Sequence, residues 1–141
     1  MSIVKFVFVV ALMLGGCSSA NREPTFKVSG DVQIDGKPLT NGMVVFMPDK
    51  GQAAKGVINP DGTFKLGTYT VDDGAVAGQF KVMVISPDRS KMQGGAADLE
   101  RPLPSLIPAR YGSTSTSGLA FEVTPTDSNV AQFALTSKAK P

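Results

Sequence analysis

Apolar and polar residues alternate with a period of two over much of the chain from Phe26 onward. In the first such stretch, Phe26, Val28, Val32 and Ile34 fall on one face, and mostly polar residues fall on the other. Successive side chains of a strand point to opposite faces, so this pattern predicts a half-buried β-strand. Further strands are predicted with inward positions at Phe64 and Leu66; at Phe80, Val82 and Val84; at Leu119, Phe121 and Val123; and at Ala131, Phe133 and Leu135.

Two weaker signals complete the predicted layout. The continuous apolar run 43–47 predicts a central strand or one covered on both sides, and residues 54–58 predict a further strand. The pair Asp35-Gly36 and the stretch 59–62 (Asn-Pro-Asp-Gly) are turn signals. Short strands separated by turns, without a helical period beyond the N-terminus, predict an all-β fold arranged as an antiparallel β-sandwich.

The N-terminus has a different pattern, typical of a signal peptide. Lys5 is followed by nine apolar residues at positions 6–14. That length suits the hydrophobic region of a signal peptide, whereas a membrane-spanning helix needs about 20 apolar residues. Gly15 and Gly16 then come directly before Cys17, the only cysteine. An ordinary signal peptide that happens to end beside a cysteine is the alternative interpretation.

The stretch Leu14-Gly15-Gly16-Cys17 resembles the lipobox of bacterial lipoproteins. The resemblance implies that a lipoprotein signal peptidase recognises Leu14, Gly15 and Gly16, and removes residues 1–16 as a cleaved lipoprotein signal peptide. It also implies that Cys17 carries a diacylglycerol and a further acyl chain. Two or three acyl chains hold a protein to a membrane firmly, whereas one is marginal.

The residues after Cys17 imply a short connection to the membrane. Ser18 after the cysteine implies sorting to the outer membrane rather than retention at the inner one, so the protein is expected at the cell envelope, facing the periplasm or the surface. Residues 17–25 form a polar, lipidated tether, and residues 26–137 form the domain. Eight residues span at most about 3.5 Å each, so the domain is expected close to the membrane.

Composition narrows the functional classes. The 141 residues fit one domain, and the net charge of +2 does not suggest a nucleic-acid partner. One cysteine excludes an internal disulfide framework, and the absence of histidine removes the usual general base and the commonest metal ligand. No catalytic residue, metal or cofactor is therefore predicted.

Several motifs in order resemble the carboxypeptidase-regulatory-like, or transthyretin-like, β-sandwich, an Ig-like two-sheet fold. They are Gly30, Gly36-Lys37-Pro38-Leu39, the run 43–46, residues 61–66 (Asp-Gly-Thr-Phe-Lys-Leu) and residues 78–82. The resemblance covers residues 26–86, and the segment 107–123 is similar to the ending of small bacterial lipoproteins built on this module. It implies an accessory domain that packs or binds partners, since the histidine motifs of the hydrolytic relatives are missing.

Two candidate sites carry chemistry in principle. The hydroxyl run at 113–117 has nucleophile types without a neighbouring base, which favours a polar loop over catalysis. Asp72 and Asp73, with Asp61 or Asp88, offer oxygen ligands for Ca²⁺, although aspartate is also favoured in turns. The turn interpretation is preferred.

The long Pro- and Gly-rich loop at 86–118 is the strongest candidate for a partner-contact site, because long loops in compact domains are often functional. Arg110 and Tyr111 in this loop are of types common in contact sites, and both are candidates for partner contact. The alternative is a covering loop anchored by apolar residues, with Arg110 in a local ion pair. The anchoring residues in this alternative are Leu103, Leu106, Ile107 and Tyr111.

These features predict a non-enzymatic lipoprotein that serves as a structural or protein-binding module of the envelope. The membrane, through the lipid on Cys17, and an envelope protein or polysaccharide are its expected partners. The alternative is a carbohydrate- or peptide-binding subunit of a surface assembly, for which Tyr69 and Tyr111 are the tyrosines that could stack on a sugar. A hydrolase is a third and less favoured hypothesis.

Overall fold

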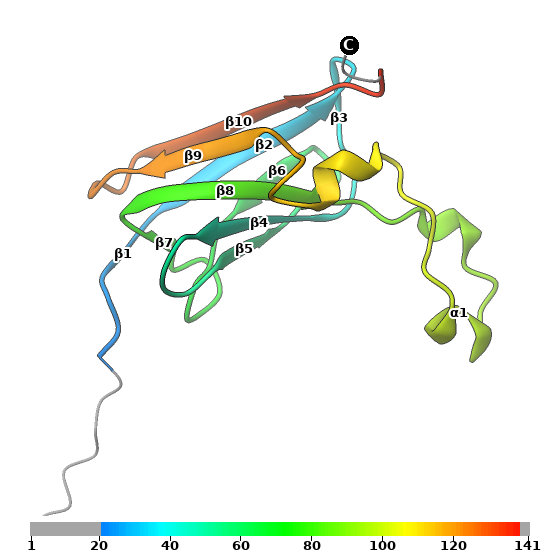
Figure 1. The fold of residues 1–141 in the computed structure, drawn as a ribbon, viewed down its shortest axis with the longest axis horizontal. Coiled ribbons are helices and arrows are strands. Elements are labelled where there is room, and N and C mark those ends of the chain that lie inside the picture. Colours follow the sequence, from blue (N-terminus) through cyan, green and yellow to red (C-terminus); the bar gives the residue numbers. More distant parts are fainter. Residues whose placement is uncertain (1–20, 139–141) are drawn as a thin grey trace, which may run out of the picture.

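The structure is a computed structural model that describes residues 21–138. The four lipobox residues, Leu14, Gly15, Gly16 and Cys17, lie outside the described residues. The described chain is almost entirely β (Figure 1). Its strands are β1 (Thr25–Phe26), β2 (Val28–Ile34), β3 (Lys37–Pro38), β4 (Met43–Pro48), β5 (Ala54–Val57), β6 (Thr63–Lys65), β7 (Ala75–Val76), β8 (Gly78–Ile85), β9 (Leu119–Val123) and β10 (Asn129–Leu135).

Two sheets pack face to face. One, named here the β4 sheet, has the strand order β5-β4-β8-β9, and the other, the β2 sheet, has the order β10-β2-β3 with β6 also paired to β2. Strands β1 and β7 form a small separate pair beside them. The all-β prediction is therefore confirmed, and β4 is the central strand that the apolar run 43–47 predicted.

The expectation of purely antiparallel sheets is wrong at one pair. Strand β10 runs parallel to β2, with Asn129 opposite Val28 and Leu135 opposite Ile34. The reason lies in the preceding connection, because β9 belongs to the β4 sheet and the chain crosses between sheets before β10 begins. Because β10 does not follow β9 in a hairpin, it need not run antiparallel to the strand that it pairs with.

One apolar core fills the space between the sheets. Phe46 of β4 is fully buried at its centre, and its ring lies 5.7–6.3 Å from four other phenylalanine rings. Edge-to-face and tilted aromatic pairs at such distances add to the burial energy. The four rings belong to Phe64, Phe80, Phe121 and Phe133.

Most predicted inward positions are confirmed. Val28 and Val32, Phe80 to Val84, and Ala131 to Leu135 alternate between buried and less buried positions as expected. The strand predicted around Phe64 is shorter, since β6 ends at Lys65 and the chain then turns into a loop held by Asp73. The predicted turn at Asp35-Gly36 is confirmed, and both residues have the positive φ of a type I′ turn.

The long loop 86–118 contains short helical turns, η1 (Arg89–Lys91), α1 (Ala97–Glu100) and η2 (Ala109–Gly112). Residues 88–104, named here the arm, project away from the sheets (Figure 1). The Asp88 N–H bonds the Pro104 carbonyl and the Leu106 N–H bonds the Ser86 carbonyl, which closes the base of the arm. The turn η2 instead returns to the body and covers the core with Ile107 and Tyr111.

Gly30 lies where β2 passes closest to its neighbours. A Cβ atom at this position would lie 1.8 Å from the Ala131 carbonyl oxygen and 2.9 Å from the Phe64 ring. Any larger residue therefore forces β10 and Phe64 apart at the middle of the core. This close backbone approach is a physical reason for glycine at position 30.

We expect Gly30→Ala to lower the free energy of unfolding by roughly 3 kcal/mol, because overpacking at a rigid backbone contact cannot relax freely. Chemical denaturation measures the change. Gly112→Ala is the matched control, since a Cβ at Gly112 would meet no atom within 4 Å. Equal stability of the two variants would contradict the close packing of β2 against β10.

Candidate functional site

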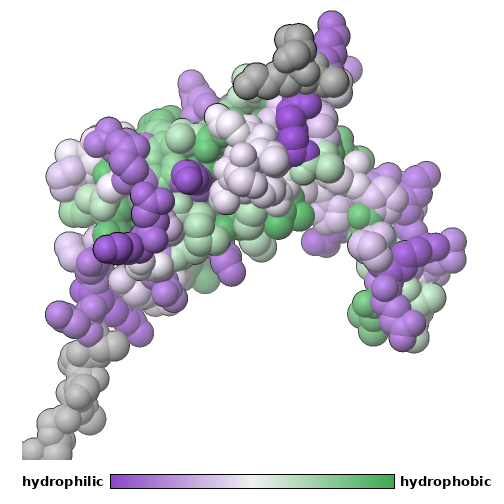
Figure 2. Space-filling view, viewed as in Figure 1, coloured by the Kyte–Doolittle hydropathy of each residue, from purple (hydrophilic) through white to green (hydrophobic). Residues whose placement is uncertain are grey.

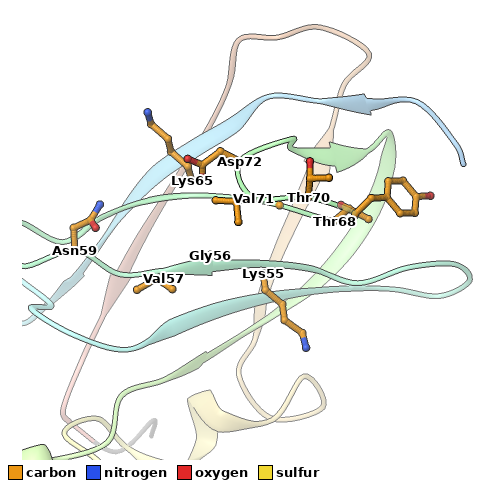
Figure 3. Close-up of a pocket in the computed structure, with 11 residues that line it drawn as sticks. Lys55, Gly56, Val57, Asn59, Lys65, Thr68, Thr70, Val71 and Asp72 are labelled. Atoms are coloured by element: carbon orange, nitrogen blue, oxygen red, sulfur yellow. The ribbon is translucent and has the colours of Figure 1, made fainter.

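An open groove of about 640 Å³ lies beside β5 (Figure 3). It runs between β5 and the loop that follows β6. Its lining residues are Lys55, Gly56, Val57, Asn59, Lys65, Gly67, Thr68, Tyr69, Thr70, Val71 and Asp72. This groove and the loop 66–74 are the candidate site.

The groove exists because the hairpin from β5 to β6 is paired only at its two ends. Lys55 and Gly67 exchange backbone hydrogen bonds at 3.0 and 2.9 Å, and the Asn59 N–H bonds the Thr63 carbonyl at 2.8 Å. Between these points, β6 pairs with β2 instead of β5, and Lys55–Gly67 stays an isolated bridge. Val57 and Lys65 are therefore not joined by the backbone hydrogen bonds that would pair them in a continuous hairpin.

The side chains around the groove do not converge on a single point. Figure 3 shows Lys55 and Lys65 pointing to opposite sides, with Thr68 at one end and Asn59 at the other. Divergent ammonium groups do not form a pocket for one small anion. The groove instead offers an elongated surface with Val57 and Val71 among polar groups, which suits an extended chain better than a compact ligand.

Asp73 fixes the loop that forms one wall of the groove. Its Oδ1 accepts the Thr68 N–H at 2.6 Å, and its Oδ2 accepts the N–H groups of Tyr69 and Thr70, each at 3.1 Å. Partial burial alone would raise the pKa of Asp73, but these N–H donors outweigh it and lower the pKa below its usual value of 3.8. The ionised carboxylate therefore stabilises the loop.

Three of the four candidate calcium ligands, Asp61, Asp73 and Asp88, accept hydrogen bonds within separate turns. Asp61 accepts the N–H and the hydroxyl of Thr63, which lowers the pKa of Asp61, and Asp88 caps η1 by accepting from Ser90. Between residues 21 and 138, no three Asp, Glu, Cys or His side chains come together. The aspartates that the sequence offered to Ca²⁺ thus act in turns in this structure.

The N-terminal segment lies against the same loop. The Arg22 guanidinium stands 5.3 Å from the centre of the Tyr69 ring, and the Glu23 N–H donates to the Tyr69 hydroxyl at 3.3 Å. The Lys27 ammonium donates to the Asp72 carbonyl at 2.6 Å. The sequence gives no sign of these contacts, because they depend on how β1 pairs with β7.

Arg110 and Tyr111 form a clip between η2 and the end of β10. The Tyr111 ring is buried, and its hydroxyl accepts the Thr136 N–H at 3.0 Å and an Arg110 Nη2 bond at 2.9 Å. The Arg110 guanidinium lies 4.5 Å from the Tyr111 ring centre and donates to the Thr136 carbonyl. Tyr111 is thus directed into the core, and Arg110 retains the partly exposed surface.

The hydroxyl run 113–117 is bound into its own loop. The Ser117 hydroxyl is buried and donates to the Val82 carbonyl, while the Thr116 hydroxyl donates to the Arg110 carbonyl at 2.6 Å. Ser113 and Ser115 bond each other at 2.9 Å. These hydroxyls hold the loop against β8 rather than face a common centre.

Sequence reasoning missed two buried polar residues that fix the loops. The Ser86 hydroxyl bonds the backbone and side-chain oxygens of Asn41, which anchors the base of the arm. Buried Asn129 accepts from the N–H of Thr124 and donates to three carbonyls, which shapes the crossing before β10. Both residues are of types favoured in turns, and that preference was their only signal.

Comparison with known proteins leaves the family open. No family model matches the chain, and no curated protein matches it. Among solved structures, a 9R-lipoxygenase from Cyanothece PCC8801 is similar with a TM-score of 0.35 and 16% identity, over 80% of this chain and 16% of the lipoxygenase chain. A likeness at that TM-score carries no argument about fold or activity. Within residues 21–138, no helix has the length and hydropathy required to cross a bilayer.

Replacing Asp73 with Asn should lower the free energy of unfolding by about 2 kcal/mol, since the amide cannot accept on both sides. The pKa of Asp73 is lowered by folding, so its stabilisation is present above pH 3.8 and is lost as the pH falls through the lower folded value. Denaturation of both proteins at pH 7 and at pH 2–3 measures this difference.

Asp72→Asn is the matched control for that loop, because the Asp72 side chain is exposed and Asn tolerates its φ of 59°. The difference between wild type and Asp73→Asn should shrink in acid, while Asp72→Asn stays near wild type throughout. A pH-independent deficit in Asp73→Asn would contradict the role of the charge.

Tyr111→Phe removes a buried hydroxyl and leaves the Thr136 N–H without its acceptor. We expect a loss of about 1–2 kcal/mol in the free energy of unfolding, measured by urea denaturation. Tyr69→Phe, which removes an exposed hydroxyl, should change stability by less than about 0.5 kcal/mol. Equal effects at both positions would show that the clip does not join η2 to β10.

Proposed function

We propose that this chain is a lipid-anchored, non-enzymatic lipoprotein of the cell envelope, in which a transthyretin-like β-sandwich acts as a structural or protein-binding module. The observation that carries the proposal is the extent of the core. Its members run from Phe26 to Leu135, and residues 21–24 are all exposed. The described core members all fall within the predicted domain 26–137, and the exposed residues 21–24 suit the end of a tether that leads to Cys17.

The motif residues of the resemblance support the sandwich type by the positions they occupy. Phe64 and Leu66 are buried in the core, and Gly30 lies at the closest backbone approach. Gly62 has a φ of 87° in the turn that precedes β6. These roles match those expected for the module, in which Asp61 and Gly62 turn the hairpin and the apolar pair packs between sheets.

A binding role is supported by the state of the reactive side chains. The hydroxyls of Ser113, Ser115, Thr116 and Ser117 are engaged in hydrogen bonds with the loop or with β8, and the carboxylates of Asp61, Asp73 and Asp88 are engaged in turns. The chain contains no histidine to act as a base. What the described surface offers instead is loops and an open groove on a rigid frame, which is the usual layout of a binding module.

The groove favours one alternative, a peptide-binding subunit of a surface assembly. Its elongated form, beside two strands that do not pair with each other along their length, suits an extended polypeptide. A carbohydrate fits less well, because Tyr111 is buried and the ring of Tyr69 is faced by Arg22. The tyrosines are thus not free stacking platforms.

The anchor is tested with Cys17→Ser in the producing bacterium. Wild type should incorporate labelled palmitate and sediment with membranes. The variant should incorporate at least tenfold less label, because the acceptor sulfur is gone. Ser18→Ala is the control, since it keeps the cysteine. Equal labelling of wild type and Cys17→Ser would refute the lipid anchor.

A further inference from the structure

The two most exposed large apolar side chains of the described surface sit at the tips of two separate projections. Val71 is 90% exposed on the loop 66–74, and Leu99 is 89% exposed in α1 of the arm. Met92, also in the arm, is 51% exposed. Single exposed apolar residues are common on protein surfaces, so their placement relative to the rest of the molecule decides whether they matter.

The loop 66–74 lies at the end of the domain from which the chain leads to Cys17. Arg22 and Glu23 contact Tyr69, two positions before Val71, and Lys27 contacts Asp72. Arg22 lies five positions after Cys17, and an extended chain over five steps spans at most roughly 18 Å. A lipid on Cys17 therefore keeps this loop close to the bilayer.

The arm reaches in the same direction. Figure 1 shows the segment before β1, the loop between β6 and β7, and the arm with α1 all extending below the sheets, with the segment and the arm at opposite ends of the domain. Figure 2 shows hydrophobic residues at the end of the arm among polar ones. The arm carries three basic residues (Arg89, Lys91 and Arg101) and three acidic ones (Asp88, Asp98 and Glu100), so its exposed apolar side chains rather than a net charge favour contact with a bilayer.

The tip of the arm is held in shape before any contact. The Asp98 carboxylate accepts the N–H groups of Gln93 and Gly94 at 2.9 and 2.7 Å, which ties α1 to the preceding turn. The closed base, described above, fixes the other end. Leu99 is therefore presented at small further cost in conformational entropy.

We propose that the domain rests on the lipid bilayer through two points, the loop 66–74 and the arm, with Val71, Met92 and Leu99 entering the boundary between headgroups and acyl chains. This inference rests on the lipid anchor of the proposed function. Three side chains bind too weakly to recruit a protein from solution, but a tethered domain experiences the surface at high effective concentration. The contacts then set orientation rather than attachment, and they turn the loop beside the groove toward the membrane.

The test uses the full-length lipidated protein, reconstituted into vesicles of phosphatidylethanolamine and phosphatidylglycerol with nitroxide-labelled acyl chains. Val71→Cys and Leu99→Cys, introduced one at a time, carry a fluorophore on the new thiol, since the Cys17 sulfur is acylated. Gln132→Cys, exposed on the outer face of the β2 sheet, is the control. We expect quenching at positions 71 and 99 to be at least twice that at position 132.

The other possible results would each contradict a different part of the proposal. Quenching no greater than at position 132, in protein that floats with the vesicles, would overturn the bilayer contact and leave the anchor intact. Quenching at only one of the two positions would overturn the two-point contact. If the fluorophores were shielded from iodide in native membranes but were not quenched in vesicles, the contact would be with a membrane protein, and the proposed contact with lipid would be wrong. Protein that does not float with vesicles at all would refute the anchor itself.

Discussion

The packing of Phe46 between the two sheets is the interaction on which the rest of the structure depends. Its ring is fully buried on β4 and lies near Phe64 and Phe133 of the β2 sheet as well as Phe80 and Phe121 of its own sheet. Each buried aromatic ring removes a large apolar area from water. These five rings hold the two sheets together and so position the loops that project from the ends of the sheets.

Among the described residues, the members of the core lie between Phe26 and Leu135. Hydrogen bonds, some of them between distant segments, fix the loops around this core. Asp73 holds the loop 66–74, Asn41 and Ser86 hold the base of the arm, and Arg110 with Tyr111 joins η2 to β10. A frame held by apolar packing and loops held by hydrogen bonds is suited to presenting surfaces, which is the role we propose.

The sequence predicted the strands well because burial on one face leaves a period of two that is visible in any single strand. It did not predict the parallel pairing of β10 with β2, since strand direction depends on a crossing between sheets that no local pattern records. The groove was also missed, because it arises where β6 pairs with β2 rather than with β5.

The candidate site residues also differ in whether their roles follow from local sequence or from the fold. Residue type suggested Arg110 and Tyr111 as contacts, but the burial of Tyr111 depends on how η2 returns over the core. Turn preference correctly favoured Asp61 and Asp73 as turn residues, because those hydrogen bonds join residues close in sequence. Contacts between distant segments, such as Arg22 with Tyr69, could be found only from the fold.

The central claim is that the β domain is anchored to a membrane by a lipid on Cys17. The intact mass of the protein extracted from its native membrane tests this most directly. We predict a chain that begins at Cys17, of 125 residues (141 − 16), with the added mass of a diacylglycerol and an acyl group. An unmodified chain that begins at Met1 would contradict the account.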